Sequence, residues 1–424
     1  MKRQWRRIAV LSTAALAGLS LAGCAGGSQS EPASSGSEPS GTITWYVNKT
    51  PTMTSAVYQK VVDEYEKQNP KVTVKVIDAG GQDLSGYLKT LISSGQAPDV
   101  TQAQTVNPDN VNNWLDLSDQ AWVKKASQTA LGKSGSYEGK IYSVPVAYQV
   151  QSLIFYNKDD FAKAGITSTP TSWAEIDSDL QKLKQAGIAP MASAGDWVPE
   201  SQIVAMTYPS LSSHWWTDRT AGKVTFSDSA WESNISRFAS WVKNGYVRKD
   251  AVGLDYANVT NDFAEGNYGM YIQGSFITTN IAQVSNPANI GVFAIPLTGG
   301  SGKAPLYVGG AEGWEVLKST KNKAASLDFV KFLGTDKQAI KTLVAADGDF
   351  SDVVSYSMSP VAQDIQTLAG KSDKLIVDQG TSVTPAAFAP MATQQIQNVF
   401  TGQSGPQISK AMDSWWTANI PASK

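Results

Sequence analysis

The segment that decides the fold runs from residue 43 to residue 100, and it contains ITWYV (43–47), SAVYQKVVDEYEKQNP (55–70), VTVKV (72–76), DLSGYLKTLISS (83–94) and DV (99–100). The first, third and fifth parts are short and rich in β-branched or aromatic residues, which is typical of strands. The second and fourth place apolar residues three and four positions apart, which predicts amphipathic helices. The order strand, helix, strand, helix, strand predicts an α/β fold with a parallel sheet and helices on its faces.

The chain beyond residue 147 repeats this alternation. Residues 152–157 (SLIFYN) are strand-like, and Ser172 begins a predicted capping box that opens a helix. Residues 290–295 (IGVFAI) and 324–333 predict another strand followed by a helix. Roughly 380 residues follow the N-terminal segment, which is too many for one core and predicts two domains.

The first 23 residues have the pattern of a signal peptide. Four cationic side chains, at positions 2, 3, 6 and 7, precede 15 apolar or small residues at 8–22. That stretch is too short for a bilayer core, which needs about 20 residues. The sequence Leu-Ala-Gly-Cys at 21–24 resembles the bacterial lipobox, which implies that Cys24 carries acyl chains and begins the mature chain. Without lipidation, the same pattern describes a secreted protein with a lone cysteine.

Residues 25–41 (AGGSQSEPASSGSEPSG) contain no large apolar side chain. Such a segment buries too little surface to offset the entropy lost on ordering, so we expect residues 24–41 to form a flexible tether. Two or more acyl chains on Cys24 would hold the protein stably at a membrane surface. The expected location is therefore the extracellular face of the cell membrane, with contact through the lipid anchor alone.

Charge and composition exclude several classes of partner. Removal of residues 1–23 leaves 31 cationic and 37 anionic side chains, a net charge of −6, and no basic run that would favour nucleic acid. Cys24 and His214 are the only cysteine and histidine, so we expect no metal site and no cofactor. Charged residues make up only 17% of a chain with 13 Trp and 15 Tyr, which fits a neutral, polyhydroxylated ligand.

Several short motifs follow one another along the chain: EYEKQNP (64–70), APDV (97–100), GKIYSVP (139–145), FYNK (155–158), FAEG (263–266), GMYIQGS (269–275) and GGAEGW (309–314). In this ordered set the chain resembles the extracellular sugar-binding proteins of ABC importers, the family 1 solute-binding proteins that are similar to maltose-binding protein. The resemblance spans residues 42–416. It implies a two-lobe α/β fold in which lobe one takes 42–147 and 278–335 and lobe two takes 148–277 and 336–424, joined by a multi-strand hinge. It also implies a monomer that closes around a carbohydrate and delivers it to permease subunits of an ABC transporter.

Ligands of open parallel sheets lie beyond the carboxyl ends of the strands. Polar or aromatic side chains beyond predicted strand ends are Asn48, Lys49, Gln102, Gln104, Tyr148, Gln149, Gln151, Ser193, Asp196 and Trp197. Trp45 and Tyr46 lie within the first strand and point to opposite faces, so at most one of them can face the ligand, with core packing as the alternative. The resemblance adds Gln273, Ser275, Phe276, Gly310, Glu312 and Trp314. We expect Trp197 and Trp314 to stack on the apolar face of a pyranose ring, supported by Tyr46, Tyr148 and Phe276. We expect Asp196, Glu312 and Gln104 to bind sugar hydroxyls.

Other aromatic residues are expected elsewhere. Trp114 and Trp173 lie in helical patterns and are predicted to be core residues. In each of the doublets 215–216 and 415–416, one tryptophan is expected to pack and the other to line a surface. Residues 347–350 (DGDF) predict a turn. As an alternative, this segment is a recognition loop that projects into the ligand site.

Two other functions stay open. A receptor for peptides or other non-sugar solutes usually clamps charged ligand ends with arginine, but only Arg219, Arg237 and Arg248 lie outside the signal peptide, away from the predicted site loops. A glycoside hydrolase needs two carboxylates roughly 5–9.5 Å apart, and several acidic residues are available. Because carboxylates on two hinged lobes would not keep a fixed separation, we expect a binding protein with no catalytic residues.

Overall fold

The computed structural model describes residues 38–50, 52–79, 84–102, 104, 106–107, 109–126, 135–299, 305–310, 313–372, 375–377 and 388–420. The chain divides into two units, residues 1–37 and 38–424. The predicted signal peptide, Cys24 and most of the predicted tether lie outside the described residues.

The first sheet contains β1 (Gly41–Val47), β2 (Val72–Asp78) and β3 (Val100–Gln102), with α1 (Ser55–Gln68) and α2 (Leu84–Ser93) in the connections. Strand β1 pairs in parallel with both β2 and β3, which confirms the predicted β-α-β-α-β unit. Strand β13 (Gly313–Val316) pairs antiparallel with β3, and β6 (Ser143–Pro145) pairs antiparallel with β13. The sheet therefore has the order β2-β1-β3-β13-β6.

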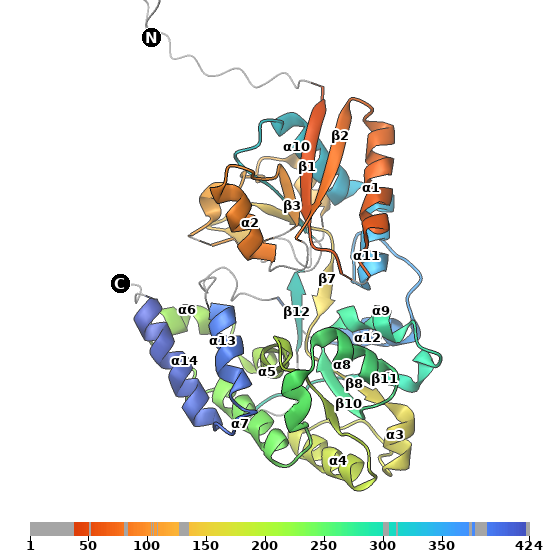
Figure 1. Cartoon of the computed structure of the whole chain (residues 1–424), viewed down its shortest axis with the longest axis vertical. Helices are drawn as coiled ribbons and strands as arrows, with labels where there is room; N and C mark the ends of the chain where they lie inside the picture. The colour runs from red at the N-terminus through yellow and green to blue at the C-terminus, as the bar shows by residue number, and fades with distance from the viewer. Residues whose placement is uncertain are drawn as a thin grey trace, which may run out of the picture. The chain divides into compact units, whose positions relative to one another are not determined.

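Successive residues of β1 enter the cores on opposite faces of this sheet, because side chains alternate along a strand. Trp45 packs edge-on against Tyr58 of α1 at 5.2 Å between ring centroids. Tyr46 lies on the other face with Leu88 of α2. The helices on the Trp45 side are α1, α10 (Lys323–Thr335) and α11 (Lys337–Asp347). Figure 1 shows α1, α10 and α11 grouped with β1 and β2, and α2 beside β3. We call this part the first lobe.

The second sheet has the order β11-β8-β10-β9, with only the β10–β9 pair parallel. Its strands are β8 (Leu153–Asn157), β9 (Met191–Ala192), β10 (Met270–Gln273) and β11 (Ile290–Ala294). Its larger helices are α4 (Trp173–Gln185), α5 (Val198–Thr207), α7 (Ala230–Lys243), α8 (Tyr256–Ala264), α12 (Pro360–Lys371), α13 (Phe388–Gln397) and α14 (Gly405–Asn419). The predicted capping box is confirmed, because Ser172 accepts from the Glu175 N–H while the Glu175 carboxylate accepts from the Ser172 N–H. We call this part the second lobe.

Shorter elements complete the structure. The strands are β4 (Ser136–Tyr137), β5 (Lys140–Ile141), β7 (Tyr148–Val150), β12 (Leu306–Gly310) and β14 (Leu375–Val377), and the helices are α3 (Lys158–Lys163), α6 (Trp215–Thr220) and α9 (Thr278–Ile281). The 3-10 turns are η1 (Val111–Asn113), η2 (Ala121–Lys125), η3 (Tyr208–Ser210), η4 (Lys249–Gly253), η5 (Ser275–Ile277) and η6 (Pro287–Asn289).

The chain passes between the lobes in the region of β7 and β12, which pair antiparallel. Val146 packs in the first lobe, whereas Val150 packs in the second. The same change of lobe occurs between β12 and β13, and again after α11. Phe350 follows α11 and exchanges backbone hydrogen bonds of 2.8 and 2.9 Å with Tyr148 of β7. These connections confirm the predicted two-lobe α/β fold with several crossing segments.

The lobe boundaries differ from those expected at residues 278 and 336. Strand β11 pairs with β8 of the second sheet, and Leu306 packs in the same lobe. Helix α11 instead packs in the first lobe, through Ile340 and Val344. The described chain therefore changes lobe near 147–150, 308–313 and 344–350. The expected boundaries failed because hydrophobic periodicity identifies a strand without identifying the sheet that it joins.

The tryptophans are mostly core residues. Trp114 and Trp173 are buried, as predicted. Trp215 and Trp216 are both buried, so the expectation that one of them lines a surface is wrong. Both rings pack against Phe226 in the aromatic core of the second lobe. The other doublet matches the expectation, because Trp416 is buried and Trp415 is only partly buried.

A buried arginine ties α6 to the C-terminal helix. Arg219 is 5% exposed, and its guanidinium donates to the Asp413 carboxylate at 2.9 Å. The guanidinium lies 5.1 Å from the ring centroids of both Phe226 and Trp416. Asp413 also accepts from the backbone N–H groups of Phe226 and Ser227. The pair is therefore enclosed by aromatic rings and by further hydrogen bonds.

We predict that Arg219→Met lowers the free energy of unfolding by about 3–5 kcal/mol, because it leaves the Asp413 carboxylate without its cation in a largely buried site. Urea denaturation measures this change. Arg248→Met is the matched control, since Arg248 pairs with Asp250 at an exposed site, where the expected loss is about 1 kcal/mol or less. Equal losses in the two variants would contradict the assignment of Arg219 as a core residue.

Candidate functional site

An exposed tryptophan backed by two further aromatic rings lies at the N-terminal end of α5. Trp197 is 39% exposed, and Trp197 and Val252 are the exposed large hydrophobic side chains among the described residues. The Trp197 ring centroid lies 4.8 Å from that of Tyr256 and 6.4 Å from that of Phe276. The Tyr256 and Phe276 centroids are 6.0 Å apart. We call these three residues the aromatic cluster.

The loop that carries Trp197 is fixed by hydrogen bonds. The carboxylate of Asp196 accepts from the N–H of Val198 at 3.1 Å and from the N–H of Tyr256 at 2.7 Å. The side-chain amide of Gln397 donates to the carbonyls of Gly195 and Asp196 at 2.6 and 3.0 Å. Asp196, predicted to bind hydroxyls, therefore also joins the loop of Trp197 to the start of α8, which carries Tyr256, and it remains half-buried.

A row of polar side chains adjoins the aromatic cluster. Gln151 donates to the side-chain carbonyl of Gln149 at 3.1 Å, and Gln149 donates to the Asp349 carboxylate at 2.8 Å. At Gly274, an added Cβ would lie 2.3 Å from the Phe276 ring and 2.6 Å from the Gln151 amide oxygen. Glycine at this position therefore lets the aromatic ring and the amide approach each other. We call Gln149, Gln151 and Asp349 the amide row.

The Tyr256 hydroxyl of the aromatic cluster keeps its proton, and burial is the main cause. Burial raises the pKa of the Tyr256 hydroxyl, and the negative charges of Asp347 and Asp196 act in the same direction. Asp347 ends α11, and it accepts a hydrogen bond of 3.4 Å from Thr52. Burial raises the pKa of the Asp347 carboxyl as well. Tyr256 is thus a neutral phenol that can donate or accept a hydrogen bond.

Polar side chains also meet at the carboxyl ends of β1 and β3. The Asn48 N–H donates to the side-chain carbonyl of Gln102 at 2.9 Å. The Gln104 amide donates to the Gln102 backbone carbonyl at 2.9 Å, and it accepts from the Ser85 hydroxyl at 2.6 Å. Asn48 and Gln102 are half-buried, and Gln104 is 9% exposed. The expectation that ligand residues follow the carboxyl ends of strands therefore selects residues that lie close together in the structure.

Of the remaining predicted residues, Tyr148 is half-buried, with its ring centroid 5.9 Å from that of Phe350. Burial and the charge of Asp352 raise the pKa of the Tyr148 hydroxyl. Gly310 pairs with Tyr148 across β12 and β7. Glu312 lies outside the described residues.

Two predicted aromatic contacts are corrected by the structure. Trp314 and Tyr46 are both 0% exposed. Trp314 packs against Trp45 at 5.1 Å on the helix-covered face of the first sheet, so it offers no ring face to a ligand. Tyr46 donates its hydroxyl to the Leu84 carbonyl at 2.9 Å on the opposite face. Both residues lie within strands rather than beyond their ends, which places their rings under helices.

Two predicted polar contacts are also buried. Gln273 is 1% exposed, and its amide donates to the Tyr271 hydroxyl at 3.2 Å while accepting from the Gly274 N–H at 3.1 Å. Ser275 is 0% exposed, and its hydroxyl accepts from the Val150 N–H at 3.1 Å. These side chains support β10 and β7 and do not reach a ligand surface here. Their prediction is corrected accordingly.

Sequence reasoning selects Gln151 as a residue beyond a strand end, but it does not select Tyr256. For Asp347 and Asp349, the sequence predicts a turn at 347–350, with projection into the ligand site as the alternative. Nothing in the sequence around Tyr256 predicts a ligand contact, because Tyr256 begins a helix about 60 positions after Trp197. Its role depends on the tertiary hydrogen bond from its N–H to Asp196.

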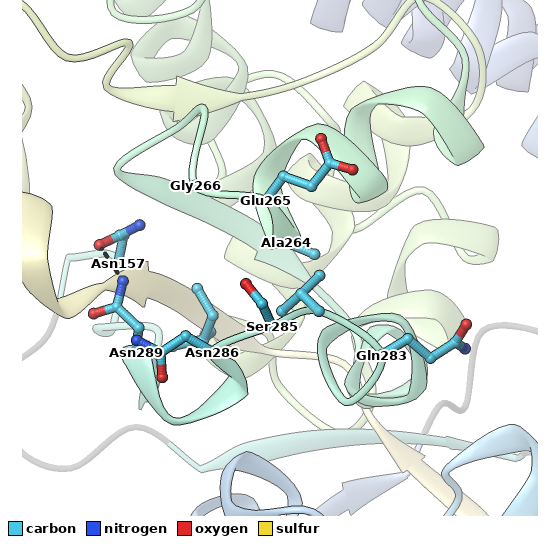
Figure 2. A pocket seen from close by; sticks show the side chains of 10 residues that line it. Asn157, Ala264, Glu265, Gly266, Gln283, Ser285, Asn286 and Asn289 are labelled. Carbon is cyan, nitrogen blue, oxygen red and sulfur yellow. Dashed lines mark hydrogen bonds between the residues drawn. The ribbon is translucent and has the colours of Figure 1, made fainter.

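A pocket of about 350 Å³ lies elsewhere in the second lobe (Figure 2), and it is lined by Asn157, residues 264–266, residues 283–286, Asn289 and Ile290. No predicted ligand residue lines it. Asn157 accepts from the Asp160 N–H and from the Asn289 amide, each at 3.0 Å. Asn289 in turn accepts from the Asp159 N–H at 3.1 Å. These amides hold the start of α3 against the turn at residues 287–289.

The described part of the chain has neither a cluster of metal ligands nor a helix of membrane-spanning character. No group of three or more histidine, cysteine, aspartate or glutamate side chains there is arranged to hold a metal ion. No helix within the same residues combines the length and apolar character needed to cross a bilayer.

Residues 50–340 match the family described as bacterial extracellular solute-binding protein. The chain is 24% identical to the multiple sugar-binding protein of Streptococcus mutans, over 81% of this chain and 82% of that protein. It is 27% identical to a maltooligosaccharide ABC transporter solute-binding lipoprotein of Streptococcus pneumoniae, over 78% and 77% of the two chains. The fold is similar to that of the GacH receptor of Streptomyces glaucescens, with a TM-score of 0.72, 21% identity, and coverage of 90% of this chain and 98% of the other. With its family matched over most of its length and its two-lobe fold shared, this chain belongs to the bacterial extracellular solute-binding proteins.

Proposed function

We propose that this protein is a lipid-anchored receptor that captures a neutral carbohydrate, of oligosaccharide length, between its two lobes and delivers it to the permease subunits of an ABC transporter. The observation that carries the proposal is the aromatic cluster, in which the exposed indole of Trp197 packs beside Phe276, and Phe276 in turn lies close to the Gln151 amide. Flat rings cover the C–H face of a sugar, and amides and carboxylates bind its hydroxyls. The names of the two Streptococcus relatives support this ligand class.

The proposed contacts combine sequence-selected residues at strand ends with residues found in the structure. Trp197, Phe276 and Tyr148 would supply ring faces. Hydroxyl partners would be Asn48, Gln102, Gln104, Gln149, Gln151, Asp196, Tyr256 and Asp347, with Gly310 and Glu312 at the connection between β12 and β13. Asp349 is 0% exposed and would act by holding the Gln149 amide. Because these residues come from both lobes, a ligand that contacts all of them favours the arrangement in which the lobes approach. The shift is limited by the difference in its affinity for the two arrangements.

The arginines favour a neutral ligand over a peptide. Each arginine beyond residue 7 already has a carboxylate partner: Arg219 pairs with Asp413, Arg237 with Asp177, and Arg248 with Asp250. A receptor for peptides or amino acids needs a cation to clamp the ligand carboxylate.

We further propose that the protein binds its ligand without chemical change and acts as a monomer. Asp196 is engaged with two backbone N–H groups, and Asp347 lies on the other lobe. A pair of carboxylates on separately moving lobes is a poor basis for glycoside hydrolysis, which needs a fixed separation.

We predict that Trp197→Ala weakens carbohydrate binding at least tenfold and leaves the thermal midpoint nearly unchanged, because the ring is exposed and its loop is held by backbone hydrogen bonds. Titration of the intrinsic fluorescence with a glycan panel, followed by calorimetry with the best ligand, measures the affinity. The matched control is Trp314→Ala, which removes a buried ring and should lower the free energy of unfolding by about 3–5 kcal/mol while the folded fraction binds normally. Equal affinity of Trp197→Ala and the parent protein would remove Trp197 from the site.

We predict that Cys24→Ser moves the protein from the membrane fraction to the soluble fraction of a bacterial host that lipidates its exported proteins. The thiol is the group that accepts the lipid, so the serine variant would carry no acyl chain. Without acyl chains the protein has no stable anchor in a bilayer. Detergent phase partition of the two proteins measures the difference. Ser28→Ala, four residues further along, is the control and should stay with the membrane. Retention of Cys24→Ser in the detergent phase would contradict the proposed anchor.

A further inference from the structure

The pocket of about 350 Å³ in the second lobe has no part in the proposed function. Its volume lies in the range of about 300–1,000 Å³ that is usual for small-molecule sites. It lies at the end of the second sheet where β8 finishes with Asn157, which pairs with Ile290 of β11. The aromatic cluster adjoins the other end of the same sheet, since Leu153 of β8 pairs with Gln273, three residues before Phe276. The pocket and the aromatic cluster are therefore separate sites.

The side-chain amide of Asn157 has a fixed orientation in this pocket. Its Oδ1 accepts from the backbone N–H of Asp160 at 3.0 Å and from the side-chain amide of Asn289 at 3.0 Å. The Oδ1 of Asn289 in turn accepts from the backbone N–H of Asp159 at 3.1 Å. Because a backbone N–H can only donate, an exchange of oxygen and nitrogen in either side chain would bring two donors together. The Nδ2 group of Asn157 must therefore point away from the start of α3.

This Nδ2 group belongs to a buried side chain and has no acceptor within the described part of the protein. Asn157 is 4% exposed, and the hydrogen bonds between its side chain and other described residues are the two that Oδ1 accepts. Gly266 also lines the pocket, and a Cβ added to this glycine would lie 3.2 Å from Nδ2. Glycine thus leaves open the space in front of the donor. A buried donor without an acceptor is unfavourable, so a ligand oxygen at this point would satisfy it.

Acceptors and apolar side chains line other parts of the pocket (Figure 2). Gln283 lies across the pocket from Asn157, and it donates its amide to the Thr279 carbonyl at 3.2 Å, which leaves its Oε1 as an acceptor. Glu265 adds an exposed carboxylate, and Ser285 adds an exposed hydroxyl. The apolar side chains of the lining are those of Ala264, Val284 and Ile290. A ligand would thus meet one oriented donor, several acceptors and some hydrocarbon surface.

This set of groups favours a neutral polyol over an ion. None of the described lining residues is Lys, Arg or His, and Lys158, which follows Asn157, donates to the Ala288 carbonyl at 2.8 Å, so an anion would find no cation. A cation at the buried end would lie against the N–H groups of Nδ2, which are donors. A hydroxyl satisfies both kinds of partner, because it accepts from Nδ2 and donates to Gln283 or Glu265.

We propose that this pocket is a second ligand site, which takes a neutral polyol of monosaccharide size with one hydroxyl oxygen on Nδ2 of Asn157. The site goes beyond the proposed function, because it is built from the second lobe alone and includes no residue of the aromatic cluster. Asn157 would then have two roles, since its Oδ1 holds the start of α3 and its Nδ2 holds the ligand.

The test is an NMR titration of the full chain, isotope-labelled at its asparagine nitrogens, with glucose, galactose, N-acetylglucosamine and myo-inositol. It follows the side-chain amide signals of the three asparagines that line the pocket, which are Asn157, Asn286 and Asn289. Phosphate and spermidine are titrated in the same way as an anion and a cation. The titrations are repeated in Trp197→Ala, which weakens the aromatic cluster and leaves the pocket intact.

Three variants address the pocket itself. Asn157→Asp keeps the acceptor oxygen that α3 requires and replaces the Nδ2 donor with a second oxygen. Asn267→Asp is the matched control, because it introduces the same charge at an exposed residue beside Gly266 that does not line the pocket. Ser285→Tyr places a large ring at an exposed position of the lining, without a change in the core.

We expect at least one of the four polyols to shift the asparagine signals saturably, with a dissociation constant in the millimolar range. The affinity should be the same in Trp197→Ala and within twofold of the parent value in Asn267→Asp. It should be at least tenfold weaker in Asn157→Asp and in Ser285→Tyr. Phosphate and spermidine should cause no saturable shift.

Four outcomes would overturn the proposal. The first is no saturable shift with any of the four polyols, and the second is equal affinity of Asn157→Asp and the parent protein. The third is a saturable shift with phosphate or spermidine alone, which would exclude a neutral ligand. The fourth is loss of the shift in Trp197→Ala, which would assign the binding to the aromatic cluster. If Asn157→Asp does not fold, the comparison of Ser285→Tyr with the parent protein decides.

Discussion

The covering of the first and second sheets by helices on both faces is the constraint on which the site depends. Side chains within a strand alternate between two cores, as Trp45 and Tyr46 do, and neither face is open to a ligand. Residues at the last position of a strand or beyond it leave these cores. The exposed indole of Trp197 and the half-buried side chains of Asn48 and Gln102 lie at such positions. Trp314 shows the converse. Tryptophan is well suited to stacking on a sugar, but this one lies inside β13 and is therefore buried in the core.

The passages of the chain between the lobes then decide which loops meet. Because β7 pairs with both β12 and Phe350, residues 148–151 lie beside residues 349–350. This explains how Gln149 reaches Asp349, about 200 positions away in sequence. Asp196 has a similar effect within the second lobe, where its hydrogen bond to the Tyr256 N–H brings two loops together. The aromatic cluster and the amide row are therefore products of tertiary connections and not of any local motif.

Sequence reasoning predicted the local parts of this arrangement well. The helix 55–68, the capping box at Ser172 and the parallel β1–β2 and β1–β3 pairs follow from residue spacing and from turn residues, which act over a few positions. It failed at the boundaries of the lobes, at the tryptophan doublet 215–216 and at Trp314, and it did not select Tyr256. Each of those outcomes depends on which distant element a helix or strand packs against. The spacing of hydrophobic residues along the chain does not identify that element. The signal-peptide and lipid-anchor predictions lie outside the described residues and stay predictions.

The most direct test of the central claim is a crystal structure of the protein with the best glycan of the panel. The account predicts a sugar ring stacked on the indole of Trp197, with hydroxyls within hydrogen-bond distance of Tyr256 and of the amides of Gln149 and Gln151. A glycan bound with Trp197 still exposed, for instance in the pocket beside Asn157 and Asn289 (Figure 2), would contradict it.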